Sequence, residues 1–142
     1  MFTVIAVVCR LVDTSAVATD YNSICIVRRG IDASYQLIDF AEVNKEVVFQ
    51  LRESKSCVLL DTRYVADFEK GSIPGALSLS LDSGLGEFNR QLESLDKTRL
   101  VVLFCQSKHC HFSDYVAAML TAKGFLDVRI FRGGIEEWFN ES

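Results

Sequence analysis

The chain has 142 residues, of which 49% are apolar and 24% charged, and its net charge is −4. This length and composition are typical of about one globular domain and exclude a disordered or low-complexity protein. The acidic balance provides no overall positive field for nucleic acid, so we expect no nucleic-acid partner. The five cysteines are odd in number and too few for a disulfide framework, which favours a reducing compartment.

Residues 1–33 are predicted to form a separate, β-rich extension. Phe2–Cys9 and Ile24–Arg28 have the composition of strands, with turn-forming residues between them. The apolar run that begins at Phe2 is far shorter than the roughly 18–20 residues of a membrane helix, so we expect no membrane span. Ala16-Val17-Ala18 resembles a signal cleavage site, but no positive charge precedes the apolar run. We therefore expect a cytoplasmic protein, with an exported or membrane-associated one as the alternative.

Residues 34–142 alternate between amphipathic segments and short apolar runs, which predict helices and strands respectively. The predicted helices cover 40–53, 65–70, 85–95, 113–123 and 136–139, and the predicted strands cover 57–60, 76–81, 100–104 and 128–131. Asp39 is expected to cap the first of these helices, and Ser113 or Asp114 the fourth. Such alternation is typical of a parallel sheet with helices on both faces. We therefore predict a single α/β domain with a mostly parallel central sheet.

The loop after the strand at 100–104 is the predicted functional site. Ligands of open parallel sheets bind beyond the carboxyl ends of the strands, and Cys105 is the first residue after this strand. The loop leads to a helix N-terminus, where inward-facing backbone N–H groups form an anion site and favour a thiolate. We predict that Cys105 is a nucleophile. The remaining polar residues of the loop are predicted to bind substrate: Gln106, Ser107, Lys108, His109 and His111.

Five short motifs follow one another between residues 38 and 139. They are Val58–Arg63, Asp67–Ala76, Val101–Cys105, Gly124-Phe125, and Val128–Gly134 followed by Trp138. The first three resemble features of the rhodanese (sulfurtransferase) domain family: a strand ending in "Asp-Val-Arg", the segment "E-F-x-x-G-H-I-P-G-A", and the strand that delivers the active cysteine. The last two together resemble the closing pattern of that family, "G-F-x-x-V-x-x-L-x-G-G-x-x-x-W". The resemblance implies a single rhodanese-like domain over residues 34–142.

The resemblance also implies an activity. Cys105 would take a sulfane sulfur from a small anionic donor such as thiosulfate, carry it as a persulfide and pass it to a thiol or protein acceptor. No cofactor is expected, and the domain would be a monomer or weak homodimer. Asp61, Arg63 and the Pro74-Gly75 turn are interpreted as scaffold. Arg63 is expected to pair with Asp67 or Glu69.

The loop departs from the common family pattern C-x-x-G-x-R-S in two ways. It is two residues longer, and it contains no arginine, because Lys108 stands where the glycine would be and Cys110 where the arginine would be. The enlargement resembles that of rhodanese-like phosphatases, but without a loop arginine to bind phosphate in bidentate fashion we do not favour that activity.

Cys110 adds a specific question. It lies five residues after Cys105 in the same loop, so the two could bridge if their Cα atoms lie within about 7 Å. Cys110 either resolves a persulfide on Cys105 or packs under the loop. The local cluster of cysteine and histidine does not match paired zinc-ligand motifs, so we expect no metal. Two alternatives to sulfur transfer stay open: a thiol redox or sulfur-sensing module that uses both cysteines, and a non-catalytic interaction domain.

Overall fold

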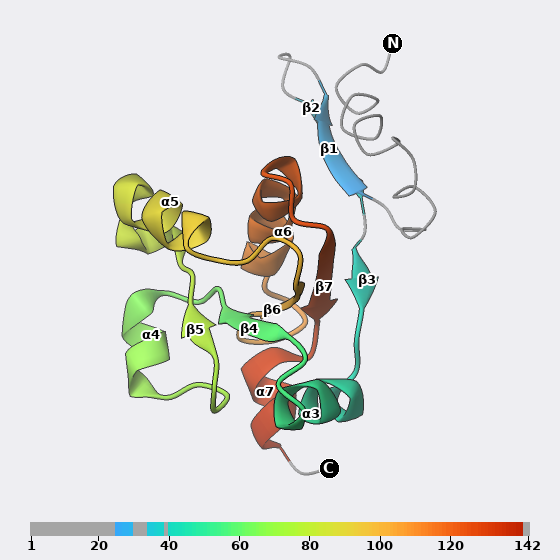
Figure 1. Ribbon diagram of the computed structural model, residues 1–142, viewed down its shortest axis with the longest axis vertical. Helices are drawn as coiled ribbons and strands as arrows, with labels where there is room; N and C mark the ends of the chain where they lie inside the picture. The colour runs from blue at the N-terminus through green and yellow to red at the C-terminus, as the bar shows by residue number, and fades with distance from the viewer. Residues whose placement is uncertain (1–24, 30–33, 39, 141–142) are drawn as a thin grey trace. The chain divides into compact units, whose positions relative to one another are not determined.

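The computed structural model describes residues 25–29, 34–38 and 40–140 of the chain (Figure 1). The chain divides into two compact units, Met1–Ala41 and Glu42–Ser142. In the first unit, β1 (Cys25–Arg29) and β2 (Ser34–Ile38) pair in antiparallel fashion. The strand predicted at Ile24–Arg28 is thus confirmed to within a residue. The strand predicted at Phe2–Cys9 and the cap predicted at Asp39 lie outside the described residues, and the boundary predicted between residues 33 and 34 stays a prediction.

A five-stranded sheet organises the described residues from 41 onward, with the strand order β3-β7-β6-β4-β5. Its strands are β3 (Ala41–Glu42), β4 (Val58–Asp61), β5 (Leu77–Ser78), β6 (Leu100–Phe104) and β7 (Asp127–Phe131). The pairs β7–β6, β6–β4 and β4–β5 are parallel. The helices are α3 (Lys45–Glu53), α4 (Val65–Lys70), α5 (Leu85–Glu93), α6 (Phe112–Ala122) and α7 (Gly134–Phe139), with a 3₁₀ turn at Leu81–Ser83. The predicted α/β domain with a mostly parallel sheet is confirmed.

Strand β6 is the centre of the core, and its residues 101–104 are all fully buried. Because successive strand residues point to opposite faces, Val102 and Phe104 share one face. These two side chains cluster with Val48 of α3, Phe131 of β7 and Trp138 of α7. Helix α6 contacts β6 and β7 with buried apolar residues of its own, which do not belong to that cluster. Figure 1 shows α3 and α7 together, away from α6, so helices cover both faces of the sheet.

Two element boundaries differ from the predictions by more than two residues. The helix predicted from Phe40 begins at Lys45, where the side chain of Asn44 caps it by accepting a hydrogen bond from the Val47 N–H at 2.9 Å. The residues before it extend along the sheet as β3 instead, because an edge strand satisfies backbone groups that a helix start would leave unpaired. The strand predicted at 76–81 is shortened to β5, since the Ser80 side chain caps the 3₁₀ turn that follows.

The strand register aligns the carboxyl ends of the strands at one edge of the sheet. Asp61, the last residue of β4, pairs with Ser78 of β5 and with Phe104 of β6, and Phe104 pairs with Phe131 of β7. We call this the carboxyl edge, and the opposite one the amino edge. The segments that follow β4, β6 and β7, including Cys105, therefore lie at the carboxyl edge, where open parallel sheets bind ligands.

Candidate active site

Cys105 follows β6 directly and begins the cysteine loop, residues 105–111. Its side chain is only 4% exposed, and its sulfur is joined to that of Cys110 by a disulfide, with the two Cα atoms 6.2 Å apart. This separation lies within the range of protein disulfides, about 4.4–6.8 Å. The structure therefore presents the loop in its oxidised form, and Cys105 has to be reduced before it can act as a nucleophile.

The backbone of the cysteine loop forms a tight turn. The Cys110 N–H donates to the Ser107 carbonyl at 3.0 Å, and the His109 N–H donates to the Ser107 hydroxyl at 3.3 Å. The N–H groups of Gln106, Ser107 and Lys108 donate no hydrogen bond to any described residue. Consecutive unpaired N–H groups near a helix N-terminus are typical of backbone anion sites. Helix α6, which begins immediately after the loop, adds its own N-terminal groups.

The predicted substrate-binding side chains all belong to this loop but differ in their surroundings. Lys108 and His109 are exposed, and neither side chain has a partner among the described residues. The Gln106 side-chain oxygen accepts a hydrogen bond from Arg63 at 3.3 Å. His111 Nδ1 lies 3.2 Å from a carboxylate oxygen of Asp114, in the first turn of α6. Lys108 and His109 therefore remain available to an incoming anion, and the substrate-binding roles themselves stay predictions.

Helix α7 holds the start of the cysteine loop through backbone hydrogen bonds. The Ile135 N–H donates to the Cys105 carbonyl at 3.0 Å, and the Glu136 N–H donates to the Gln106 carbonyl at 2.9 Å. Gly134 allows this approach, because a Cβ atom there would lie 2.3 Å from the Cys105 oxygen. Gly134 also has a φ of +61°, in the left-handed region that favours glycine.

We expect Gly134→Ala to lower the free energy of unfolding by about 1–3 kcal/mol, because the new methyl group collides with the loop backbone in a strained conformation. Gly86→Ala is the matched control. Gly86 lies in α5, and a Cβ there has open space around it, so alanine should leave stability unchanged or raise it by up to about 1 kcal/mol. Urea unfolding of both variants measures the difference, and equal effects would contradict this account.

A buried ion pair connects the end of β4 to the cysteine loop. Asp61 is fully buried, and its carboxylate accepts hydrogen bonds from Arg63 Nη2 at 2.8 Å and from the Ser72 hydroxyl at 2.6 Å. Arg63 Nη2 also donates to the Gly71 carbonyl at 2.7 Å. Together with its bond to Gln106, Arg63 thus joins three segments at the carboxyl edge.

The prediction that Arg63 pairs with Asp67 or Glu69 is wrong. The Arg63 N–H itself donates to the Asp61 carboxylate at 2.9 Å, in a local turn that brings the Arg63 side chain back onto Asp61. Asp61 lies only two residues earlier in the chain and is already buried, so it is a nearer partner than Asp67 and Glu69 on the following helix, neither of which is buried. The scaffold interpretation of Asp61 and Arg63 is consistent with these contacts.

We expect Asp61→Ala to destabilise the domain by about 3–5 kcal/mol, because it leaves the buried Arg63 guanidinium without its counter-charge. The matched control is Glu87→Ala, which removes the carboxylate of an ion pair with Arg90, whose side chain is 72% exposed. Exposed pairs contribute about 0–1 kcal/mol, so this control should unfold close to wild type. Denaturant midpoints of the two variants test the difference, and similar losses would refute the role assigned to Asp61.

Two polar contacts at the carboxyl edge have no signal in the sequence. Arg132 forms a bidentate pair with Asp114 at 2.9 and 3.0 Å and donates to Glu42 at 3.1 Å. Burial lowers the pKa of the Arg132 guanidinium, because it disfavours the charged form. The hydrogen bonds and negative charges of Asp114 and Glu42 have the larger opposite effect, so the pKa is raised overall. Because two carboxylates already engage Arg132, it does not replace the arginine that the cysteine loop lacks.

The Ser113 hydroxyl is the other such contact, and it corrects a prediction. Its oxygen lies 3.2 Å from the Thr62 hydroxyl, which donates to the Phe104 carbonyl at 2.9 Å. Because α6 begins at Phe112, Ser113 and Asp114 both lie inside its first turn, and neither caps the helix as predicted. The cap position is His111, without a side-chain hydrogen bond to the helix.

Two kinds of feature are absent from the described residues. No group of three or more histidine, cysteine, aspartate or glutamate side chains in that part of the chain is arranged to hold a metal ion. None of the helices in the same part is both long and apolar enough to cross a membrane.

Comparison with known proteins decides the family. Residues 44–141 match the family model described as the rhodanese-like domain. The chain belongs to the rhodanese-like domain family. Among curated proteins, the thiosulfate sulfurtransferase GlpE of Coxiella burnetii is 29% identical over 99 residues, which cover 70% of this chain and 87% of the relative. The resemblance drawn from the motifs is thus confirmed at the level of the family.

Solved structures share the same fold. The BH2092 protein of Bacillus halodurans superimposes with a TM-score of 0.61 at 21% identity, covering 69% of this chain and 70% of that one. The human single-domain sulfurtransferase TSTD1 gives a TM-score of 0.59 at 21% identity, covering 71% of this chain and 97% of that one. At these identities the likeness shows the rhodanese-like fold alone.

Proposed function

We propose that this rhodanese-like domain is a sulfurtransferase that carries a sulfane sulfur as a persulfide on Cys105. The observation that carries the proposal is the position of Cys105 at the carboxyl edge, at the start of a loop with three consecutive unpaired N–H groups. A persulfide and its donor are both anions, which such groups stabilise. The name of the curated relative, a thiosulfate sulfurtransferase, supports thiosulfate as a donor.

In the first half-reaction, the thiolate of reduced Cys105 attacks the outer sulfur of thiosulfate. The sulfur–sulfur bond of the donor breaks, and sulfite leaves with the bonding electron pair. Cys105 then holds one additional sulfur as a persulfide anion. The N–H groups of Gln106, Ser107 and Lys108 would hold the donor, and afterwards the persulfide.

In the second half-reaction, a thiolate acceptor attacks the outer sulfur of the persulfide. The new sulfur–sulfur bond forms on the acceptor, and the Cys105 thiolate leaves, ready for another cycle. The exposed Lys108 and His109 border the route that such an acceptor would take to a cysteine that is itself buried. We propose a small thiol or a protein thiol as this acceptor.

The mass of the intact protein after thiosulfate treatment tests the proposal. The protein is first reduced, because the oxidised loop has no free Cys105 thiol, and is then freed of reductant. At early times after mixing, before any thiol has removed the sulfur, we expect the mass of one added sulfur in wild type, located on the peptide that contains Cys105. A wild-type protein that gains no sulfur and releases no sulfite would favour a non-catalytic interaction domain.

Lys108 is expected to supply part of the anion binding that an arginine gives in the common loop. A lysine ammonium is a point charge without a bidentate fork, so this binding should be weak and should fall as salt is raised. Lys108→Ala should raise KM for thiosulfate about threefold to tenfold with a smaller change in kcat. Lys123→Ala, at the far end of α6, is the matched control and should behave as wild type. A loss confined to kcat would assign the anion to another group.

The disulfide supports a second candidate function, a redox cycle within the loop. If Cys110 attacks the inner sulfur of the Cys105 persulfide, the Cys105–Cys110 disulfide forms and hydrosulfide leaves. An external thiol would then reduce the disulfide and restore both cysteines. The 6.2 Å separation of the two Cα atoms shows that the loop accommodates the product of this step.

A further inference from the structure

A hollow of about 430 Å³ lies at the amino edge of the sheet, opposite the cysteine loop. Its size falls within the range of small-molecule pockets, roughly 300–1,000 Å³. Cys57 directly precedes β4 and Arg99 directly precedes β6, whereas Cys105 follows the other end of β6. The lining comes from α3, the turn after it, the starts of β4 and β6, and the turn before β5: Arg52, Lys55, Cys57, Leu59, Arg99 and the Pro74-Gly75 turn.

Three of the lining side chains are cationic, in a chain whose net charge is −4. Lys55 Nζ has no partner among the described residues, and Arg99 forms no ion pair with any of them. Arg99 instead donates from Nη2 to the Lys55 carbonyl at 2.9 Å, which fixes the guanidinium at the rim. The acidic neighbours are Glu53, paired with Arg52, and Asp96, which feels the charge of Arg99. The hollow therefore keeps an excess of positive charge.

Arg52 contributes an unused donor. Its guanidinium carbon lies 5.8 Å from the ring centres of both Phe49 and Trp138, and its Nη1 atom is 3.0 Å from Glu53. Its Nε atom is buried and has no hydrogen-bond partner among the described residues. Buried donors without an acceptor are rare in proteins, and a bound ion or ligand is one common explanation.

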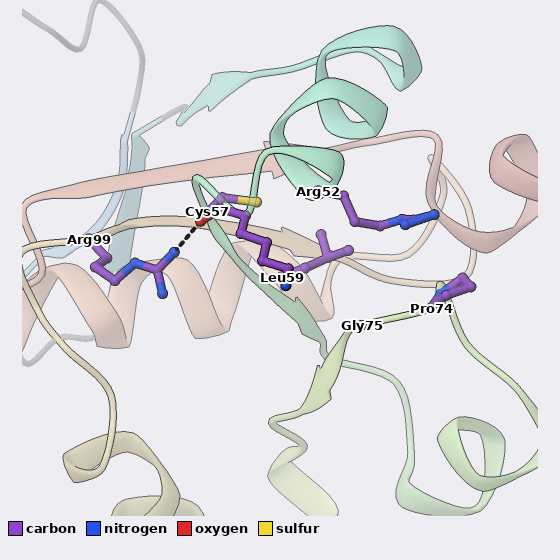
Figure 2. A pocket seen from close by; sticks show the side chains of 7 residues that line it. Arg52, Cys57, Leu59, Pro74, Gly75 and Arg99 are labelled. Atoms are coloured by element: carbon purple, nitrogen blue, oxygen red, sulfur yellow. Dashed lines mark hydrogen bonds between the residues drawn. The ribbon is translucent and has the colours of Figure 1, made fainter.

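The remaining wall combines a thiol with apolar groups. Figure 2 shows Cys57 and Leu59 between the guanidinium groups of Arg99 and Arg52, with Pro74 beyond them. Cys57 is a free, half-buried cysteine. Burial raises the pKa of its thiol, and the Arg99 cation offsets part of that rise.

We propose that this hollow binds a small oxyanion with an apolar body, held by the charges of Lys55, Arg99 and Arg52 against Leu59 and Cys57. The oxyanion supplies an acceptor for the Lys55 ammonium and for the Nε atom of Arg52, and the apolar body covers Leu59 and Pro74. The thiol of Cys57 then lies beside the bound anion. The hollow therefore attracts negatively charged reagents that react with thiols and directs them to Cys57. This site is separate from the cysteine loop.

Two alkylating reagents of similar shape test this charge selection. Iodoacetate carries a carboxylate and iodoacetamide does not, yet both transfer their carbon to the Cys57 thiolate and release iodide. The ratio of the two rates on one cysteine cancels its thiolate fraction. We expect the ratio of the iodoacetate rate to the iodoacetamide rate at Cys57 to fall about fivefold in Lys55→Gln. In water, one unit charge about 4 Å from the reagent's carboxylate attracts it by about 1 kcal/mol, which corresponds to that factor. The rates are read from the Cys57 peptide by mass spectrometry.

A matched charge change and a competing anion complete the test. Lys70→Gln removes an exposed lysine at the end of α4, outside the hollow, and should leave the ratio unchanged. Sodium phosphate should slow iodoacetamide at Cys57 in wild type, relative to sodium chloride of equal ionic strength, and this protection should be lost in the doubly substituted K55Q/R99Q protein. A ratio that Lys55→Gln leaves unchanged, or protection that survives in the double variant, would overturn the proposal.

Discussion

Cys105→Ser is expected to abolish sulfur transfer from thiosulfate, with a loss of about 10³-fold or more, because a serine hydroxyl neither ionises near neutral pH nor forms a persulfide. Sulfite release in the presence of an added thiol measures the overall reaction. The side chain is almost fully buried, and serine is close to cysteine in size, so the variant should keep the fold. The loss would therefore report chemistry and not unfolding.

Cys57→Ser is the matched control for this loss. Cys57 also adjoins a parallel strand, but it is half-buried and lies at the amino edge, outside the cysteine loop. Its replacement should leave the rate of sulfite release within about twofold of wild type, as expected for a site without a role in the reaction. Transfer that persists in Cys105→Ser, or that disappears in Cys57→Ser, would refute the assignment of the sulfur to Cys105.

Local patterns predicted the elements whose signal is strong and continuous. The buried strand β6 and the helix α4 have the predicted bounds, because an apolar run covered on both faces and a terminating glycine leave little choice. The predicted start of α3 was wrong, because Phe40 and Val43 have a helical spacing. The two residues between them, Ala41 and Glu42, instead form the outer strand β3 of the sheet. Tertiary hydrogen bonding decided that boundary.

The candidate site was predictable where its residues are contiguous. Cys105 and Cys110 lie in one loop, so their closeness follows from spacing. The hydrogen bond from Arg63 to Gln106 and the partners of Arg132 do not follow in the same way. Arg132 meets Asp114 from a different strand end, and nothing in either local pattern marks that pair. Long-range polar contacts depend on strand register, which no local pattern specified.

Cys110→Ser is expected to lengthen the life of the Cys105 persulfide. In the proposed redox cycle, Cys110 would attack from within the loop, where its effective concentration is of the order of millimolar for a short tether. At about 10 μM protein, attack by other molecules is slower by about 10²-fold, so removing Cys110 should extend the lifetime by about that factor when no thiol is added. The first half-reaction should be unchanged, since the N–H groups that we propose hold the donor precede position 110.

The decay of the persulfide peak by mass spectrometry, in both proteins and without added thiol, measures this effect. Wild type should lose the added sulfur, release hydrosulfide and end two hydrogens lighter than the reduced protein, as formation of the Cys105–Cys110 bond requires. Cys110→Ser should keep the sulfur and show no such loss. His109→Ala changes the same exposed turn without removing a thiol, and it should decay as wild type does. Equal lifetimes in wild type and Cys110→Ser, with no internal disulfide in wild type, would remove the redox cycle. Cys110 would then be a packing residue, and Cys105 would transfer its sulfur only to an external acceptor.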